Sequence, residues 1–265
     1  MERPLFLEEI DDDGVARVTL TRPSKHNAMN AALVSELTTA LEGLASDART
    51  RCLVLAGEGE SFCAGGDLEA MAALADADES AIRADADALA ALLTTLDRFP
   101  MPTMALVHGA AIGGGLGLVA CCDIVVADSS ARFAMPEARL GLVPGVIAPF
   151  VAAAIGERRA RTYSLTGDRF DAAEGHAFGL VHVHVHGGGL ETRGREIVDS
   201  LLKGAPGAQH DSKMQLQGLR GGGPDDATIS DGAARLAVRR ASEEGREGIR
   251  AFLDKRRPAW RPPNR

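Results

Sequence analysis

Basic residues are outnumbered by acidic ones in this chain of 265 residues, and cysteines are few. Its 29 Lys and Arg residues face 37 Asp and Glu residues, so the net charge is −8. Proteins that bind phosphate backbones need clustered basic side chains, so this acidic balance argues against nucleic acid or an anionic membrane surface as partner. No pair among the four cysteines has zinc-site spacing, and we expect buried thiols in a reducing compartment.

Long uninterrupted apolar segments are absent as well. The most apolar stretch, residues 104–127, is broken by glycines and contains His108 and Asp123, so it does not read as a membrane span. The first fourteen residues are acidic and lack the apolar core of a signal peptide. We therefore expect a cytoplasmic protein, and its 45% hydrophobic residues supply ample material for a folded core.

Strand-like and helix-like segments alternate along the first 150 residues. The segment 29–47 has apolar residues at helical spacing, and "RCLVLAG" at 51–57 is typical of a strand buried in a parallel sheet. Further strands are expected at 5–10, 15–21, 101–109 and 123–128. Beyond Pro149 the spacing is mostly helical, with one short strand at 180–186. This order predicts an α/β fold with a parallel sheet, followed by a helical C-terminal region.

Two glycine-bearing turns lie between a buried strand and a helix. They are "SFCAGGDL" at 61–68 and the triplet Gly113, Gly114 and Gly115. A helix N-terminus presents unpaired N–H groups, and glycine lets a ligand approach the backbone closely. Two such turns could aim one N–H each at a single point and form an oxyanion hole. Close strand–helix packing is the alternative interpretation, whereas the spacing does not fit a nucleotide-binding glycine loop.

The motifs "RPSKHNAMN", "SFCAGGDL", "HGAAIGGG", "CDIVVAD" and "FLDKRRPAW" together resemble the crotonase, or enoyl-CoA hydratase/isomerase, superfamily. The resemblance covers nearly the whole chain. It implies a spiral core of repeated ββα units over residues 1–200 and a helical trimerisation region over residues 201–265. Trimers of this superfamily commonly pair into hexamers. The implied substrate is an acyl-CoA thioester, with no separate cofactor and no metal.

The resemblance also assigns binding residues. The thioester carbonyl is expected between the backbone N–H groups of Gly66 and Gly114, which would stabilise negative charge on its oxygen. Phe252 and Lys255, on the C-terminal helix, match positions that reach a neighbouring subunit's CoA. The residues that match contacts to CoA within one subunit are Lys25, Ala28, Ala64, Asp67 and Leu68.

The acid–base residues depart from the pattern of a typical hydratase in this superfamily, which has two glutamates. One is present as Glu137 in "FAMPEARLG", and the other is replaced by Gly117. The apolar surroundings of Glu137 predict a raised pKa suited to proton transfer. We expect Glu137 to be the principal proton-transfer residue, and Gly117 to leave space for substrate or water.

Three functions remain open on this evidence. Hydration of a 2-enoyl-CoA ranks first, because the segments 117–124 and 139–167 resemble the branch that hydrates methylglutaconyl-CoA and related branched, carboxylated enoyl-CoAs in leucine or acyclic-terpene breakdown. A carboxylated acyl group would need a cation, for which Arg83, Arg139 and Arg158 are candidates. Double-bond isomerisation by a single glutamate ranks second, and CoA binding without turnover is the third possibility.

Three histidines alternate in "LVHVHVH". His182, His184 and His186 would share one face of a strand, where they could hold a metal ion. No obvious fourth ligand is near them, and the superfamily needs no metal. We therefore favour a solvent-facing strand without a metal.

Overall fold

A six-stranded sheet forms the centre of the molecule. The computed structural model describes residues 3–74, 77–219 and 223–263. Along the sheet the strands follow the order β1, β2, β3, β4, β6, β9, and every neighbouring pair is parallel except β1 and β2. The predicted parallel α/β architecture is therefore confirmed. The strands of this sheet are β1 (Phe6–Ile10), β2 (Val15–Leu20), β3 (Cys52–Gly57), β4 (Thr103–Val107), β6 (Ile124–Asp128) and β9 (Val183–Val185).

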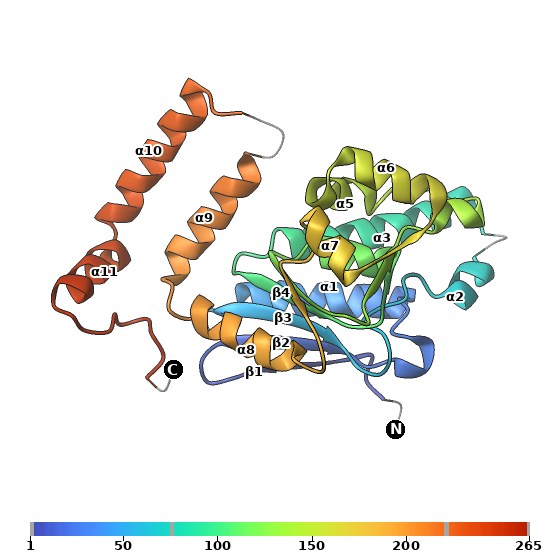
Figure 1. Ribbon diagram of the computed structural model, residues 1–265, viewed down its shortest axis with the longest axis horizontal. Helices are drawn as coiled ribbons and strands as arrows, with labels where there is room; N and C mark the ends of the chain where they lie inside the picture. The colour runs from blue at the N-terminus through green and yellow to red at the C-terminus, as the bar shows by residue number, and fades with distance from the viewer. Residues whose placement is uncertain (1–2, 75–76, 220–222, 264–265) are drawn as a thin grey trace.

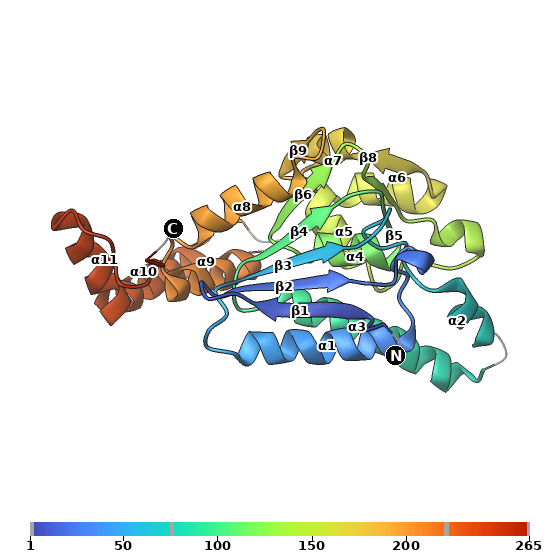
Figure 2. The same ribbon diagram turned by 90° about the horizontal axis from the view of Figure 1, so that it is seen from below.

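Helices cover both faces of the sheet, with α1 (Ala31–Ser46) on one side and α8 (Leu190–Leu201) on the other (Figure 2). Strand β3 shows why an almost wholly apolar strand is needed here. Leu53 and Leu55 belong to the large core that includes residues of α1 and α3 (Glu79–Asp97). Val54 and Ala56 point to the opposite face, where they pack with Val198 and Leu202 at α8.

A second, three-stranded sheet holds the region around the glycine triplet. Strand β7 (Arg132–Ala134) lies between β5 (Ala110–Ile112) and β8 (Arg169–Asp171). Each of these strands has three residues, and a strand that short cannot be predicted from an alternating apolar–polar pattern. Helix α4 (Gly114–Ala120) begins two residues after β5 and therefore starts at a position that both sheets fix.

Smaller helices complete the body of the molecule (Figure 1). They are α2 (Leu68–Ala73), α5 (Ala148–Ile155), α6 (Glu157–Thr166) and α7 (Ala172–Phe178), with 3-10 helices η1 (Pro23–Lys25) and η2 (Glu137–Leu140). The strand expected at 180–186 is shorter than predicted, because β9 pairs with β6 over three residues.

The C-terminal helices α9 (Pro206–Gly218), α10 (Asp226–Ala241) and α11 (Glu243–Leu253) extend away from this body (Figure 1). Helix α10 buries none of its residues in the single chain. Its apolar side chains Ile229, Leu236 and Val238 are 62%, 69% and 72% exposed. Among the described residues, no helix is both long and apolar enough to cross a membrane.

Candidate active site

The first glycine turn is fixed by a short backbone ladder with the segment after η1. Ala64 N–H donates to His26 O (2.9 Å), Met29 N–H to Gly65 O (2.7 Å), and Asp67 N–H to Met29 O (2.8 Å). Gly65 has a φ of +94°, a conformation that L side chains rarely adopt, so glycine is required there. This geometry leaves the exposed Gly66 with a backbone N–H that has no acceptor in the described part of the chain.

The second glycine turn lies directly against the first. Cys63 N–H donates to Ala110 O (2.9 Å), and Ile112 N–H donates to Cys63 O (3.0 Å). Gly113 turns the chain with a φ of +52°. Gly114 is then the first residue of α4, and its N–H finds no acceptor among residues 3–74, 77–219 and 223–263.

The two unpaired N–H groups belong to adjoining backbone. A Cβ atom built on Gly65 would lie 3.6 Å from the backbone nitrogen of Gly114. A Cβ atom on Gly115 would lie 2.2 Å from Cys63 O, so a side chain at Gly115 would force the turns apart. Two preorganised donors without partners are the arrangement that binds a carbonyl oxygen as it gains negative charge.

Glu137 stands beside the second turn. A Cβ atom on Gly113 would lie 3.1 Å from its Oε1, while its Oε2 is buried and lacks a hydrogen-bond partner in the described structure. Burial raises the pKa of this carboxyl above the ordinary glutamate value. No ion pair engages Glu137 among the residues that the structure describes, so this carboxyl lacks the charged partner that a structural glutamate usually has.

The space expected at Gly117 is filled. A Cβ atom there would lie 2.8 Å from Ile147 Cγ2 and 3.0 Å from Leu93 Cδ1. Both side chains are buried, with 2% and 0% of their surfaces exposed. The expectation that Gly117 leaves room for substrate or water is thus wrong, because helices α3 and α5 bring apolar side chains against this face of α4.

The residues expected to contact CoA within one subunit come together at the first turn. Asp67 caps α2 by accepting from the N–H groups of Glu69 and Ala70, and Leu68 is 63% exposed. Lys25 Nζ lies 2.6 Å from Glu69 Oε1. The backbone ladder described above brings Ala28 and Ala64 to the same place.

The C-terminal candidates lie elsewhere. Phe252 is on α11 and Lys255 follows it, at the opposite end of the molecule from α2 in both views (Figures 1 and 2). Phe252 is 83% exposed. Within one chain, the structure therefore does not bring these two residues to the glycine turns.

Arg22 is a residue that the sequence reasoning missed. Its guanidinium donates to Ala28 O and lies 3.0 Å from Asp67 Oδ2, and that hydrogen bond lowers the pKa of Asp67. It thereby joins the two segments of the first turn. The signal that could have pointed to Arg22 is its position as the first residue of "RPSKHNAMN", one of the motifs that resemble the superfamily.

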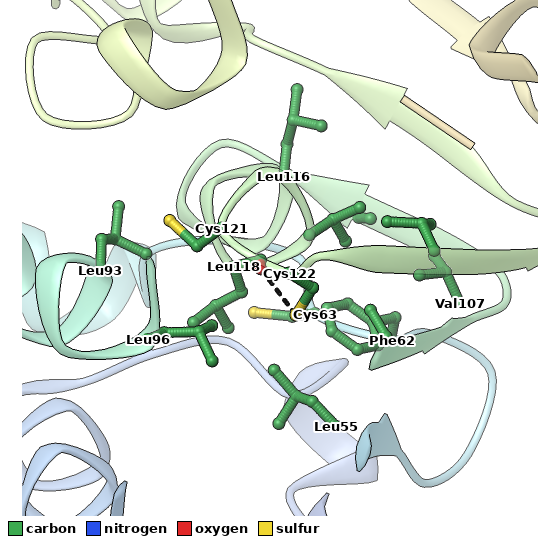
Figure 3. Close-up of a cluster of buried hydrophobic side chains, with 14 of the residues drawn as sticks. Leu55, Phe62, Cys63, Leu93, Leu96, Val107, Leu116, Leu118, Cys121 and Cys122 are labelled. Atoms are coloured by element: carbon green, nitrogen blue, oxygen red, sulfur yellow. Dashed lines mark hydrogen bonds between the residues drawn. The ribbon is translucent and has the colours of Figure 1, made fainter. Parts of the chain in front are cut away.

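A cluster of buried side chains includes Cys63 of the first turn (Figure 3). Cys63 and Cys122 point into it together with Leu55, Leu93 and Leu118. Burial raises the pKa of both thiols to about 12. These cysteines therefore pack as apolar groups and are not thiolate nucleophiles at neutral pH.

The three arginines considered for a carboxylated substrate lie on the surface. Arg83 pairs with Asp87 on its own helix, and Arg139 pairs with Asp168. Arg158 is exposed on α6. The structure thus engages two of these three side chains in ion pairs with this chain's own acids.

The alternating histidines do not converge as a set of three. His182 Nδ1 accepts from Val125 N–H (3.0 Å), whereas His184 Nε2 and His186 Nδ1 lie 3.2 Å and 2.5 Å from Ser129 Oγ. Among the described residues, no group of three or more His, Cys, Asp or Glu side chains could hold a metal ion.

Around the two glycine turns, the structure thus places two backbone N–H groups without acceptors in the described residues and a carboxyl whose buried Oε2 has no hydrogen-bond partner there. The sequence model for the enoyl-CoA hydratase/isomerase family matches residues 11–263. The chain belongs to this family, the crotonase superfamily, whose members act on CoA thioesters.

Individual relatives include both activities named by the family. A putative enoyl-CoA hydratase from Thermus thermophilus is 32% identical, over 95% of this chain and 99% of that protein. A mitochondrial Δ(3,5)-Δ(2,4)-dienoyl-CoA isomerase from Dictyostelium discoideum is 30% identical, over 97% and 91%. The crystal structure of an enoyl-CoA hydratase from Shewanella pealeana superimposes with a TM-score of 0.93 at 39% identity, covering 97% of this chain and 96% of that one.

Proposed function

We propose that this protein hydrates a 2-enoyl-CoA thioester. The observation that carries the proposal is that the Gly66 and Gly114 N–H groups, on adjoining turns, lack acceptors in the described residues while Glu137, with an unbonded buried Oε2, lies beside Gly113. In the proposed complex, the thioester oxygen accepts hydrogen bonds from both amides.

The chemistry then runs through that oxygen. Glu137 takes a proton from water as the water oxygen bonds to C3 of the substrate, and the electron pair of the double bond moves onto the thioester oxygen. The two amides stabilise the resulting enolate. The protonated Glu137 then gives a proton to C2, the thioester carbonyl re-forms, and the carboxylate is ready again.

Double-bond isomerisation is the second candidate, and the filled space at Gly117 favours it. One carboxylate suffices to move a proton between C2 and C4 of an enoyl-CoA, without any water as reactant. Relatives of both activities match this chain. CoA binding without turnover is the third possibility, against which the unbonded, buried Oε2 of Glu137 argues.

A panel of three thioesters separates these functions. The purified chain is incubated with crotonyl-CoA, methylglutaconyl-CoA and a straight 3-enoyl-CoA, and products are followed by mass spectrometry and chromatography. Hydration adds the mass of one water to either 2-enoyl substrate, whereas isomerisation shifts the 3-enoyl substrate at constant mass. Turnover of the 3-enoyl substrate alone would replace hydration by isomerisation, and binding of all three without products would leave a CoA-binding protein. Preference for methylglutaconyl-CoA over crotonyl-CoA would assign a branched, carboxylated acyl group.

The CoA moiety is proposed to lie along Lys25, Ala28, Ala64, Asp67 and Leu68, which the first turn gathers. Phe252 and Lys255 are proposed to reach the CoA of a neighbouring subunit. Because Lys25 already pairs with Glu69, we expect CoA phosphates to compete with that carboxylate for the ammonium group.

Residues 201–265 are proposed to form the oligomerisation region, and residues 1–200 the acyl-CoA-binding core. The exposed Leu236, Val238 and Phe252 support this division, because a helix needs a partner surface to bury such side chains. Sedimentation velocity of the full chain should show a trimer or hexamer, and a monomer at micromolar concentration would contradict the proposal. The four buried thiols fit the proposed cytoplasmic location.

A further inference from the structure

Two buried side chains close the face of α4 that follows the oxyanion turn. Gly114 and Gly117 are three residues apart in this helix and therefore share a face. Next to Gly117 lie Ile147, at the start of α5, and Leu93, from α3. Figure 3 shows Leu93 in the buried cluster beside α4.

The neighbours of the glycines differ in chemistry along this helix. The nearest side chain to Gly113 is Glu137, and those nearest to Gly114 are Met29 and Leu89. Beside Gly117 the contacts are Ile147 and Leu93, at 2.8 Å and 3.0 Å from a built Cβ atom. Within this set of five side chains, Glu137 is the group that can carry a proton.

We propose that Leu93 and Ile147 form a hydrocarbon plug that determines the one-carboxylate chemistry of this site. The plug occupies the volume that any side chain at Gly117 would need, and its burial keeps water from that face of α4. Ile147 can thus pack against α4 at this position because Gly117 has no side chain. The catalytic part of this inference rests on the proposed function, whereas the steric part does not.

The plug has a consequence for proton transfer. A proton taken from water by Glu137 has no second carboxyl beside Gly117 through which to leave, so the same carboxyl delivers the proton to C2. The fall of turnover at low pH should then follow one ionisation, that of Glu137. No second carboxyl would add a further ionisation to the pH profile. The Leu93–Ile147 pair is therefore a specificity determinant that acts by exclusion.

The steric part is tested by a double-mutant cycle on unfolding. The variants are Gly117→Ala, Ile147→Ala and their combination, with Ile155→Ala as matched control, since Ile155 is a buried isoleucine at the other end of α5. Gly117→Ala should lower Tm by about 5 °C in the wild-type background, the range expected for overpacking. In the Ile147→Ala background, Gly117→Ala should leave Tm unchanged or raise it. In the Ile155→Ala background, Gly117→Ala should lower Tm as it does in the wild type. Equal effects of Gly117→Ala in all three backgrounds would overturn the plug.

The catalytic part is tested by offering a second carboxyl. Gly117→Glu alone should lose activity or fold poorly, because the buried carboxyl has no room. Combined with Ile147→Ala, it should raise kcat/KM for crotonyl-CoA about tenfold over Ile147→Ala alone, a modest share of what a general acid contributes. The pH profile of this double variant should gain a second ionisation, which a purely structural role of Ile147 would not produce.

These two measurements fail separately. An unfolding cycle without coupling would overturn the plug whatever the enzyme does. If the unfolding cycle shows coupling but the wild type turns over none of the three thioesters, the plug is retained and the proposed function is rejected. Coupling together with hydration, but no gain from the Gly117→Glu and Ile147→Ala combination, would overturn the claim that the plug limits the chemistry to one carboxylate.

Discussion

The two ends of one short face of α4 have opposite environments. Gly113, just before the helix, lies next to a carboxyl with a buried oxygen that has no partner in the described residues, whereas Gly117 is packed against hydrocarbon. The Gly113 end keeps polar groups unsatisfied, which costs stability. At the Gly117 end, Ile147 and Leu93 pack closely against the helix and leave no space for a second catalytic side chain. The contrast teaches that the site concentrates its unfavourable groups at a single point and surrounds that point with an ordinary core.

Glu137→Gln should remove the chemistry from the reactive end and leave its shape. We expect turnover to fall at least about 10²-fold, because the amide cannot accept the proton. The measurement is kcat on whichever thioester the wild type converts, together with binding of a saturated thioester, which should be retained. Glu196→Gln, at an exposed carboxylate paired with Arg193 on α8, is the control and should keep full activity. Near-normal activity of Glu137→Gln would contradict the assignment.

Gly114→Pro should remove one of the two proposed oxyanion donors without breaking the helix, because proline is tolerated at the first position of a helix. Gly114 is the first residue of α4, where proline is accepted because its missing N–H has no helical partner. Gly114→Ala is the matched control, since it adds the Cβ contact to Met29 but keeps the N–H. We expect the proline variant to lose about 10²-fold or more in kcat relative to the alanine variant. Equal activities in the two variants would show that this N–H does not bind the oxygen.

The pH dependence of turnover should report the burial of Glu137. Burial raises the pKa of this carboxyl, and the base must be ionised to act. Activity should therefore decline on acidification at a higher pH than an exposed glutamate would give, following a single ionisation. A kcat/KM profile of the wild type measures this limb, and a midpoint at or below the ordinary glutamate range would contradict it.

The smallest expected effect is on stability. The pKa of Glu137 is raised in the folded state, so the wild type loses stability as pH rises through the unfolded and then the folded pKa. Glu137→Gln cannot ionise and should raise Tm by about 2 °C near neutral pH. The gain should vanish at a pH where the wild-type carboxyl is protonated in both states. A Tm advantage that persists unchanged into acid would show that ionisation is not its cause.

The sequence predicted much of this site because its signals are local. The turns at 61–68 and 113–115 follow apolar strands and precede helices, so their place at adjoining strand ends could be inferred. Glu137 was selected as a candidate through a motif and its apolar neighbours. Leu93 and Ile147 could not be found in this way, since each looks like any core residue and their contact with Gly117 depends on how α3 and α5 pack.

By itself, the chain's periodicity determined the parallel α/β order, and its motifs determined the superfamily through their resemblance to it. The tertiary structure decided the three-residue strands β5, β7 and β8, which are too short to carry a periodic signal. It also decided what stands opposite each glycine of α4. A glycine in a sequence says only that a side chain is absent, and whether that absence is a cavity, a substrate pocket or a close contact is set by residues 24 and 30 positions away along the chain, at Leu93 and Ile147, which folding brings within van der Waals reach.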